Sequence, residues 1–194
     1  MNHLKFAFAG QTQALEYAAA ELQRQGCQLV SESADFILTD VPVRSDLTEI
    51  LQAHPDSIII GGKLQLPLRK TIDLLEDPIY LAHNANITAH CAVKLLLQQL
   101  PVILTDLPIL VVGWGRIGKC LAALLRNMGA KVSVLARKDG DNAILSALGY
   151  SLGQAQDLSA YRVIFNTAPC MVLNETVMQT CSPDCLKIDL ASSP

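Results

Sequence analysis

The sequence has little charge, few aromatic residues and no long apolar run. Charged residues make up 17% of the 194 residues and aromatic residues 5%, whereas 51% are hydrophobic. No apolar run approaches the roughly 20 residues that a bilayer-spanning helix needs, and the N-terminus lacks the basic start and apolar block of a signal peptide. We therefore expect a cytoplasmic protein without membrane association. Its apolar balance fits a sheet covered by helices on both faces.

A basic stripe and a zinc-binding cysteine pattern are also missing. The net charge is −3, whereas nucleic-acid-binding proteins usually cluster Lys and Arg to neutralise phosphates. Among the six cysteines only Cys181 and Cys185 are close in sequence, and no second pair stands at zinc-finger spacing. Without a secretory signal, reduced thiols are expected rather than disulfides. The sequence therefore indicates no nucleic-acid partner and no metal site.

Alternation of strand-like and helix-like segments predicts an α/β fold. We expect a Rossmann-type doubly wound parallel sheet, preceded by a smaller flavodoxin-like α/β domain. The predicted strands are 4–9, 27–30, 34–38, 57–60 and 79–82 in the first portion, then 109–112, 131–136, 150–152, 163–165 and 186–190 in the second. The predicted helices are 11–25, 46–53, 71–76, 86–100, 119–128, 141–148, 158–161 and 174–180.

The predicted helix over residues 86–100 is long and broadly apolar, and Pro101 follows it directly. We interpret it as a bridge between two domains. Residues 1–85 would form the N-terminal substrate-side domain, and residues 86–194 would form the dinucleotide-binding domain. Because no glycine-serine linker separates the two portions, hinge-coupled domains are expected.

A G-x-G-x-x-G motif follows the predicted strand 109–112 and opens the helix after it. In this context the motif is typical of dinucleotide binding, because the helix N-terminus offers N–H groups to a pyrophosphate. Gly113 would allow the turn, Gly115 the close approach of the phosphates, and Gly118 the packing of helix on strand. A merely structural turn is the alternative. The loop residues expected at the cofactor are Gly113, Trp114, Gly115, Arg116, Ile117 and Gly118.

The tip of the next predicted strand distinguishes NADP from NAD. An acidic residue there would bind the ribose 2′-hydroxyl of NAD, whereas a cation would accept the 2′-phosphate of NADP. This chain has Ala136, Arg137 and Lys138 at that point, with no carboxylate before Asp139. The sequence therefore favours NADP. The alternative is that Arg137 and Lys138 are only solvent-exposed charges on a surface loop, and NAD stays possible.

Polar residues also follow the last two predicted strands. Asn166, Thr167 and Pro169 come after one strand, and Asp189 ends the other. Because the carboxyl ends of parallel strands line the ligand crevice, both stretches are expected to face the nicotinamide half of the cofactor. The alternative is a plain turn, since Asn-Thr-x-Pro is good turn chemistry by itself.

Five blocks of sequence together resemble the dipicolinate synthase A subunit. They are 86–89, 112–118, 130–138, 165–169 and 188–192. The glycine loop is more distantly similar to those of the D-isomer-specific 2-hydroxyacid dehydrogenases. The resemblance implies an NADP-dependent oxidoreductase that dehydrogenates a hydroxy-tetrahydrodipicolinate to dipicolinate in sporulation. It also implies a small dicarboxylate substrate, a flavoprotein-like B subunit of that synthase as partner and a homodimer, and Thr88 of the first block joins the expected cofactor contacts.

Two departures from that family bear on catalysis. The family continues after the last block through a glycine pair, a strand and helices, so the second domain is expected to lack its C-terminal closing elements. A shortened chain, a degenerate relative, and a chain completed by a partner or second copy all stay open. His90 and Cys91 stand where the family usually has an acidic residue and a glycine.

The sequence does not single out a proton-handling group. Candidates are His83, His90 and Asp189, each with a plain surface, capping or structural role as the alternative. Lys63 and Arg69 are candidates for a substrate carboxylate on charge alone. Two other functions are alternatives. A shikimate-type dehydrogenase fits poorly, because Asn86-Ile87-Thr88 is not followed by that family's proline and lysine, and a non-catalytic dinucleotide-binding module is the rival of a different class.

Overall fold

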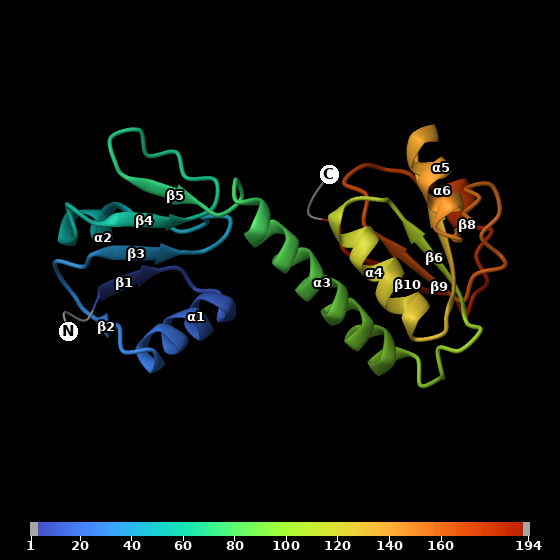
Figure 1. Cartoon of the computed structure of the whole chain (residues 1–194), viewed down its shortest axis with the longest axis horizontal. Coiled ribbons are helices and arrows are strands. Elements are labelled where there is room, and N and C mark those ends of the chain that lie inside the picture. Colours follow the sequence, from blue (N-terminus) through green and yellow to red (C-terminus); the bar gives the residue numbers. More distant parts are fainter. Residues whose placement is uncertain (1–3, 192–194) are drawn as a thin grey trace. The chain divides into compact units, whose positions relative to one another are not determined.

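The computed structural model describes residues 4–191, and the chain divides into two compact units, Met1–Leu81 and Ala82–Pro194. Each unit contains one five-stranded parallel sheet (Figure 1). The predicted α/β class is therefore confirmed, with a separate sheet in each portion of the chain. None of the helices within residues 4–191 has the length and apolar character needed to cross a membrane.

In the first unit the strands lie in the order β2-β1-β3-β4-β5, and every neighbouring pair is parallel. This 2-1-3-4-5 order is that of flavodoxin-like sheets. The strands are β1 (Lys5–Ala9), β2 (Gln28–Leu29), β3 (Phe36–Thr39), β4 (Ile58–Gly61) and β5 (Thr71–Asp73), and the helices are α1 (Gln13–Arg24) and α2 (Thr48–Ala53). Buried Ile37 and Ile59 centre a small core with Ala7 and Ala34.

A buried carboxylate marks the point where the connections of this sheet reverse, between β1 and β3. Asp40 follows β3 and is only 5% exposed. Its carboxylate accepts a hydrogen bond from the Thr12 hydroxyl (2.5 Å) and one from the Gln11 N–H (3.3 Å), just before α1 begins. The first turn of α1 is thus stabilised by a negative charge of the chain itself.

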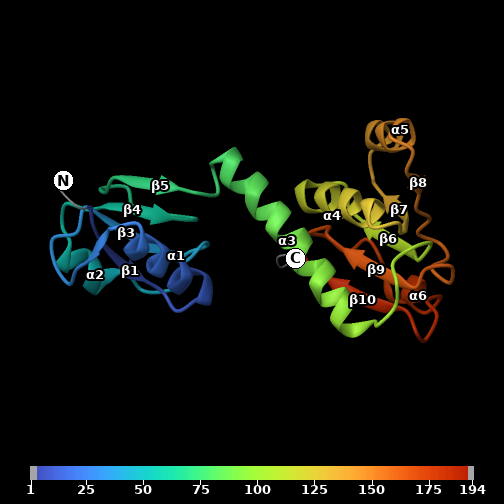
Figure 2. The same ribbon diagram turned by 60° about the horizontal axis from the view of Figure 1, so that its bottom comes forward.

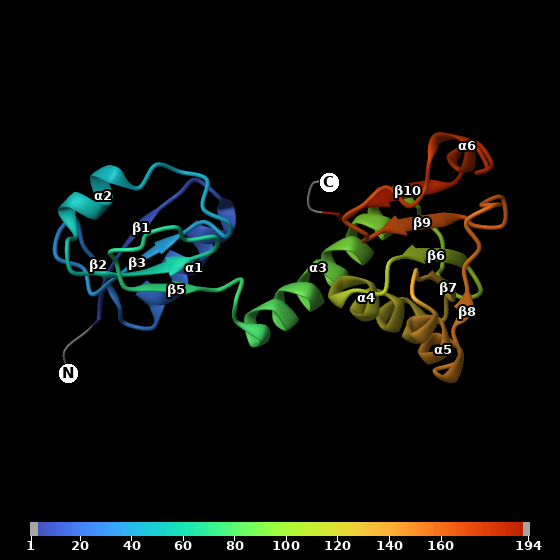
Figure 3. The same ribbon diagram turned by 90° about the horizontal axis from the view of Figure 1, so that it is seen from above.

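The sheet of the second unit has the order β10-β9-β6-β7-β8, again all parallel (Figure 3). Counted within the unit, this is the 3-2-1-4-5 order of a Rossmann-type sheet, with its switch point between β6 and β9. The elements are α3 (Pro78–Gln99), β6 (Pro108–Val112), α4 (Arg116–Asn127), β7 (Lys131–Leu135), α5 (Asp139–Ala147), β8 (Ser151–Leu152), β9 (Val163–Asn166), α6 (Glu175–Met178) and β10 (Leu186–Asp189).

Alternate residues of β6 serve two cores on opposite faces of this sheet. Ile109 and Val111 belong to the larger cluster, which includes residues of α3 and α4. Leu110 and Val112 belong to the smaller one, against which α6 packs. Figure 2 shows α3 and α4 on one side of β9 and β10, and α6 on the other. The fully buried β6 therefore reads as a continuous apolar run, as a strand covered on both faces should.

Three local predictions were wrong. Residues 79–82 are not a strand but the first turn of α3, which begins eight residues before the predicted start at Asn86. The physical reason is an N-cap: the Asp77 carboxylate accepts a hydrogen bond from the Ile79 N–H (2.8 Å), and Pro78 takes the first helical position. Residues 71–76 contain β5 rather than a helix, because Thr71–Asp73 pairs with β4. Residues 158–161 form only a turn.

Candidate functional site

Two of the three motif glycines are required by the packing of the chain itself. Gly113 has a φ of +102°, and a Cβ there would lie 2.7 Å from the Thr167 hydroxyl. A Cβ at Gly118 would overlap the carbonyl oxygen of Gly113. These two positions therefore exclude any side chain, because the neighbouring atoms are backbone or a side chain held by its own hydrogen bonds.

Gly115 is different. It is the N-cap of α4, with an ordinary φ of −78°. In the part of the chain that the structure describes, no atom beyond Gly115 itself and its two neighbours in the sequence lies within 4 Å of the place a Cβ would take. The packing of the protein therefore gives no reason for a glycine here. Open space beside the backbone at this point is what a ligand needs in order to approach the loop closely.

The N-terminus of α4 is suited to an anion. The first helical hydrogen bond runs from the Lys119 N–H to the Gly115 carbonyl (3.0 Å), so the N–H groups of the three preceding residues have no acceptor within the helix. The first turn carries no acidic residue, and Arg116 and Lys119 are exposed beside it. N–H groups, helix dipole and side chains all favour a negative charge at this place.

Trp114 anchors the loop to the core instead of pointing into the open space. Its half-buried ring meets Tyr150 edge-on, with ring centroids 5.5 Å apart, and it packs against the larger core cluster. The Lys119 ammonium lies 5.8 Å from the ring centroid. The indole N–H is buried and lacks an acceptor among residues 4–191. Trp114 thus offers a ligand its backbone rather than its ring.

Thr167 fastens the end of β9 to the glycine loop. Its N–H (2.8 Å) and its hydroxyl (2.9 Å) both donate to the carbonyl of Val112, the last residue of β6. The hydroxyl proton is therefore used within the protein, and Thr167 supports the loop rather than offering a free donor. This role was missed from the sequence, because nothing in Asn-Thr-x-Pro says which strand end the threonine meets.

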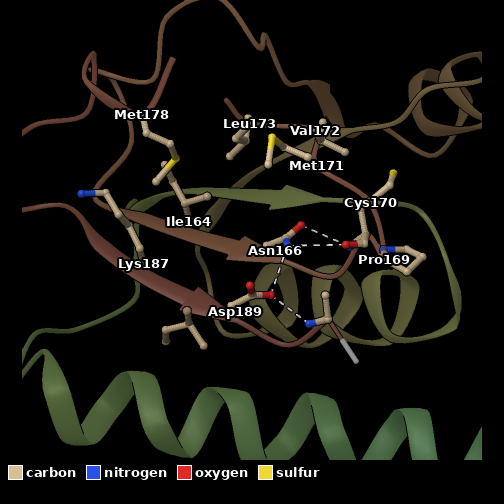
Figure 4. Close-up of a pocket in the computed structure, with 13 residues that line it drawn as sticks. Ile164, Asn166, Pro169, Cys170, Met171, Val172, Leu173, Met178, Lys187 and Asp189 are labelled. Carbon is tan, nitrogen blue, oxygen red and sulfur yellow. Dashed lines mark hydrogen bonds between the residues drawn. The ribbon is translucent and has the colours of Figure 1, made fainter. Parts of the chain in front are cut away.

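Asn166 and Asp189 point toward one another at the ends of β9 and β10 (Figure 4). The Asn166 side-chain NH₂ donates to Asp189 Oδ1 (3.1 Å), and Asn166 Oδ1 accepts from the Ala168 N–H (3.2 Å). Asp189 Oδ1 also accepts from the Ala191 N–H (2.9 Å). Both predicted polar positions are thus brought together, and each binds the other.

A pocket of about 370 Å³ opens beside this pair. Asn166, Asp189 and Lys187 are its polar members, and Pro169 and Cys170 lie on its wall. Apolar side chains line the side away from Asp189 (Figure 4), namely Met171, Val172, Leu173 and Met178. A pocket of this kind, apolar with a few convergent polar groups at the carboxyl ends of strands, has the general character of a small-molecule site.

The two cations predicted to bind the 2′-phosphate lie at the end of β7. Ala136 is half-buried, and Arg137 and Lys138 are exposed between β7 and α5. Lys138 is the N-cap of α5. Since β7 is the direct neighbour of β6 in the sheet, this tip and the glycine loop lie at the same carboxyl edge.

The remaining candidates lie elsewhere. Thr88 is on α3, where its hydroxyl donates to the Asn84 carbonyl (2.8 Å) of the same helix. His83 and His90 are exposed on α3, and neither side chain forms a hydrogen bond or ion pair with another described residue. Arg69, in the first unit, donates to the Leu51 carbonyl (2.8 Å). The glycine loop, the β7 tip, Asn166, Thr167, Pro169 and Asp189 thus lie at the carboxyl edge of one sheet, whereas Thr88, His83 and His90 lie on helix α3.

Comparison with known proteins gives one curated relative of clear similarity. The dipicolinate synthase A subunit of Bacillus subtilis (strain 168) is 29% identical over 130 residues, which are 65% of this chain and 44% of the relative. The match thus spans less than half the length of that protein. No family model matches the chain. The resemblance expected from the five sequence blocks is confirmed.

Solved structures show the same fold. The dipicolinate synthase A subunit from Bacillus halodurans superposes with a TM-score of 0.77 at 20% identity, covering 97% of this chain and 82% of that one. A transhydrogenase from Sinorhizobium meliloti gives 0.73 at 15% identity, covering 96% and 78%. D-lactate dehydrogenase from Escherichia coli gives 0.61 at 15% identity, covering 96% and 73%. The arrangement of strands and helices is thus shared with proteins whose names denote dehydrogenases and a transhydrogenase.

Proposed function

We propose that the second unit binds a nicotinamide dinucleotide, with NADP preferred over NAD, and that the chain is an oxidoreductase. One observation carries the proposal. Gly115 faces open space at the N-terminus of a helix whose first N–H groups lack helical acceptors, while the other two motif glycines are accounted for by packing. Glycine is also a favourable N-cap residue, but the N-cap role does not require the open approach to the backbone that a pyrophosphate needs.

The described residues fit such a cofactor. The backbone N–H groups from Gly115 to Gly118 would hold the pyrophosphate, with Arg116 adding a charge-assisted contact. Arg137 and Lys138 would receive the 2′-phosphate. Pro169 would lie toward the nicotinamide half, and Trp114, Ile117, Ala136 and Thr88 complete the proposed set. When bound, the cofactor supplies a ring that accepts or gives a hydride.

We further propose the reaction that the resemblance implies, the dehydrogenation of a hydroxy-tetrahydrodipicolinate to dipicolinate in sporulation, in which the substrate loses one water molecule from its hydroxyl group and two hydrogens as a hydride and a proton. The similarity to the curated relative supports it. Loss of a hydride from the substrate ring leaves a proton for a nearby group, for which His83, His90 and Asp189 are the proposed candidates. Because the relative is named as one subunit of a synthase, a partner protein is part of the proposal, together with a homodimer and a cytoplasmic location.

Cofactor preference can be tested with the fluorescence of Trp114, the only tryptophan in the chain. NADPH added to the protein should quench it by energy transfer, with a lower Kd than NADH. Replacing Arg137 by Ala removes one charge-assisted contact to the 2′-phosphate, so the Kd for NADPH should rise roughly tenfold and that for NADH should change little.

Lys131→Ala is the matched control for that variant, because Lys131 lies on the same strand but at its other end, paired with Asp106 (3.1 Å). Equal binding of NADPH and NADH, unchanged in Arg137→Ala, would overturn the NADP assignment. Turnover is tested separately, by following NADPH formation with the hydroxy-tetrahydrodipicolinate. Binding without turnover, alone and with the partner protein, would favour a non-catalytic binding module.

A further inference from the structure

We infer that Asp189 is a positioning residue, which holds the Asn166 side chain and through it the turn that supports the glycine loop. The inference rests on the proposed dinucleotide site and concerns how that site is kept in shape. Of the two roles open to Asp189, it assigns hydrogen-bond acceptance rather than the proton transfer, for which His83 and His90 then remain the candidates. Three consecutive sets of contacts carry it, from β10 through β9 to β6.

The first set joins β10 to β9. Asp189 and Asn166 are register partners in the parallel ladder, and the Leu190 N–H donates to the Asn166 carbonyl (2.8 Å). The side-chain bond from Asn166 to Asp189 lies beside this last backbone bond. Asp189 Oδ1 is at the same time fixed by the Ala191 N–H. The carboxylate is therefore held by two donors at the end of an edge strand.

The second set fixes the turn after β9. A carboxylate can only accept hydrogen bonds, so it selects the NH₂ end of the Asn166 amide. The amide oxygen is then turned toward the Ala168 N–H, to which it is bonded at 3.2 Å. Asp189 Oδ1 and the Ala168 backbone thus favour the same orientation of the amide, whose NH₂ also approaches the Ala168 carbonyl (3.5 Å). Without Asp189 the NH₂ group would lose its shorter, 3.1 Å partner, and the amide would be held by Ala168 alone.

The third set reaches the glycine loop. Thr167 lies between Asn166 and Ala168, and its N–H and hydroxyl both donate to the Val112 carbonyl. Its hydroxyl oxygen also closes the space beside Gly113 and Gly118, at 2.7 and 3.1 Å from the places their Cβ atoms would take. Loosening residues 166–168 therefore loosens the support of the loop, although Asp189 lies two strands away from β6.

The two roles considered for Asp189, positioning and proton transfer, differ in which substitutions of Asp189 should impair the protein. Asn in place of Asp189 still offers an oxygen to the Asn166 NH₂ and to the Ala191 N–H, so it keeps the hydrogen bonds but cannot take a proton at neutral pH. Ala removes both functions. The positioning role therefore predicts that Asp189→Asn rescues what Asp189→Ala loses.

The first experiment measures NADPH affinity of the full chain through Trp114 fluorescence. The Kd should rise about tenfold in Asp189→Ala, the loss of one hydrogen bond to a charged group, and stay within about threefold of wild type in Asp189→Asn. Asp184→Ala is the control, because Asp184 is an exposed carboxylate near the same strand, 3.7 Å from Arg162. Wild-type affinity in Asp189→Ala would overturn the inference.

A swap of the two side chains tests the pair directly. Asn166→Asp places two carboxylates against each other and should weaken NADPH binding more than Asp189→Asn does. The double variant Asn166→Asp, Asp189→Asn restores one donor facing one acceptor, so it should recover affinity relative to Asn166→Asp. A double variant no better than Asn166→Asp would contradict the proposed coupling.

A measurement on the free protein, without NADPH, tests the positioning role of Asp189 independently of the proposed dinucleotide binding. Amide hydrogen exchange of Ala168 in the free protein should speed up in Asp189→Ala and stay slow in Asp189→Asn and Asp184→Ala. If wild type fails to bind NADPH but this pattern is seen, the dinucleotide site is wrong and the positioning role stands. If Ala168 exchanges equally in all four proteins, the positioning role is wrong whatever the chain binds.

Discussion

Gly115 and Gly118 stand three residues apart in one motif, yet a methyl group would meet open space at the first and a backbone carbonyl at the second. The motif predicted the loop and the helix that follows it. It could not show that Thr167 closes the space beside Gly113, or that Asp189 binds Asn166, because these two pairs are 54 and 23 residues apart in sequence. Such pairing depends on strand order, which a single sequence leaves open.

The two glycines therefore predict two different alanine phenotypes. Gly115→Ala should lower the free energy of unfolding by no more than about 1 kcal/mol, because Ala is a poorer N-cap residue than Gly. It should raise the Kd for NADPH at least tenfold, because the methyl group fills the space proposed for the phosphates. Gly118→Ala should lower the free energy of unfolding by about 1–3 kcal/mol, because backbone must move. Fluorescence titration and urea unfolding measure both. A Gly115→Ala variant with unchanged affinity would contradict the proposed site.

At the scale of elements, periodicity and turn signals predicted the core strands well and the helix starts less well. Four residues of β6 and three of β9 are buried and apolar, and prolines, polar residues and glycines bound these runs, so their pattern was unambiguous. The helix α3 was predicted from Asn86, because residues 79–82 alone resemble a short buried strand. The signal that decides against this is Asp77-Pro78, an N-cap followed by proline at the first helical position.

The Cys185 thiol, in the segment between α6 and β10, should make the stability of the fold fall at alkaline pH. Burial raises the pKa of the Cys185 thiol from an ordinary value of 9.0 to about 11, and nearby Cys181 adds to the shift. The unfolded chain would lose this proton near pH 9 and the folded chain only near pH 11. Stability from this group is therefore fully present below pH 9 and falls between pH 9 and 11.

Urea midpoints at pH 8 and pH 10.5 measure that fall. Because the titrating group is gone in Cys185→Ala, the midpoint of this variant should drop less between the two pH values than that of wild type. Cys91→Ala, which removes an exposed thiol on α3, should behave as wild type. The same drop in all three proteins would show that Cys185 does not titrate as its burial implies.

At the scale of the whole molecule, the sequence predicted a smaller flavodoxin-like α/β domain followed by a Rossmann-type parallel sheet. The structure confirms this fold class, with the strand order 2-1-3-4-5 in the first unit and 3-2-1-4-5 in the second. The two units also differ in core size. Among residues 4–191, the first unit has a small cluster around Ile37 and Ile59 and a few further buried residues such as Phe6, whereas the second has a larger and a smaller cluster on opposite faces of its sheet.

This difference predicts stepwise unfolding in urea. The smaller core should melt first, seen by circular dichroism, and Trp114 fluorescence should report only the later loss of the second unit. NADPH at about 100 times its Kd should stabilise that later step by about 2.7 kcal/mol and leave the earlier one in place. A single transition followed identically by both probes would contradict two independent cores.

The carboxylate of Asp40 has a consequence for stoichiometry. Each unit has a glycine-containing turn between its first strand and the helix after it, so each offers a helix terminus at a topological switch point. In the first unit that place carries a negative charge fixed by Thr12 and Gln11, which would repel a phosphate. Although both units have a parallel sheet with a helix N-terminus at its switch point, binding of the dinucleotide should therefore saturate at one molecule per chain.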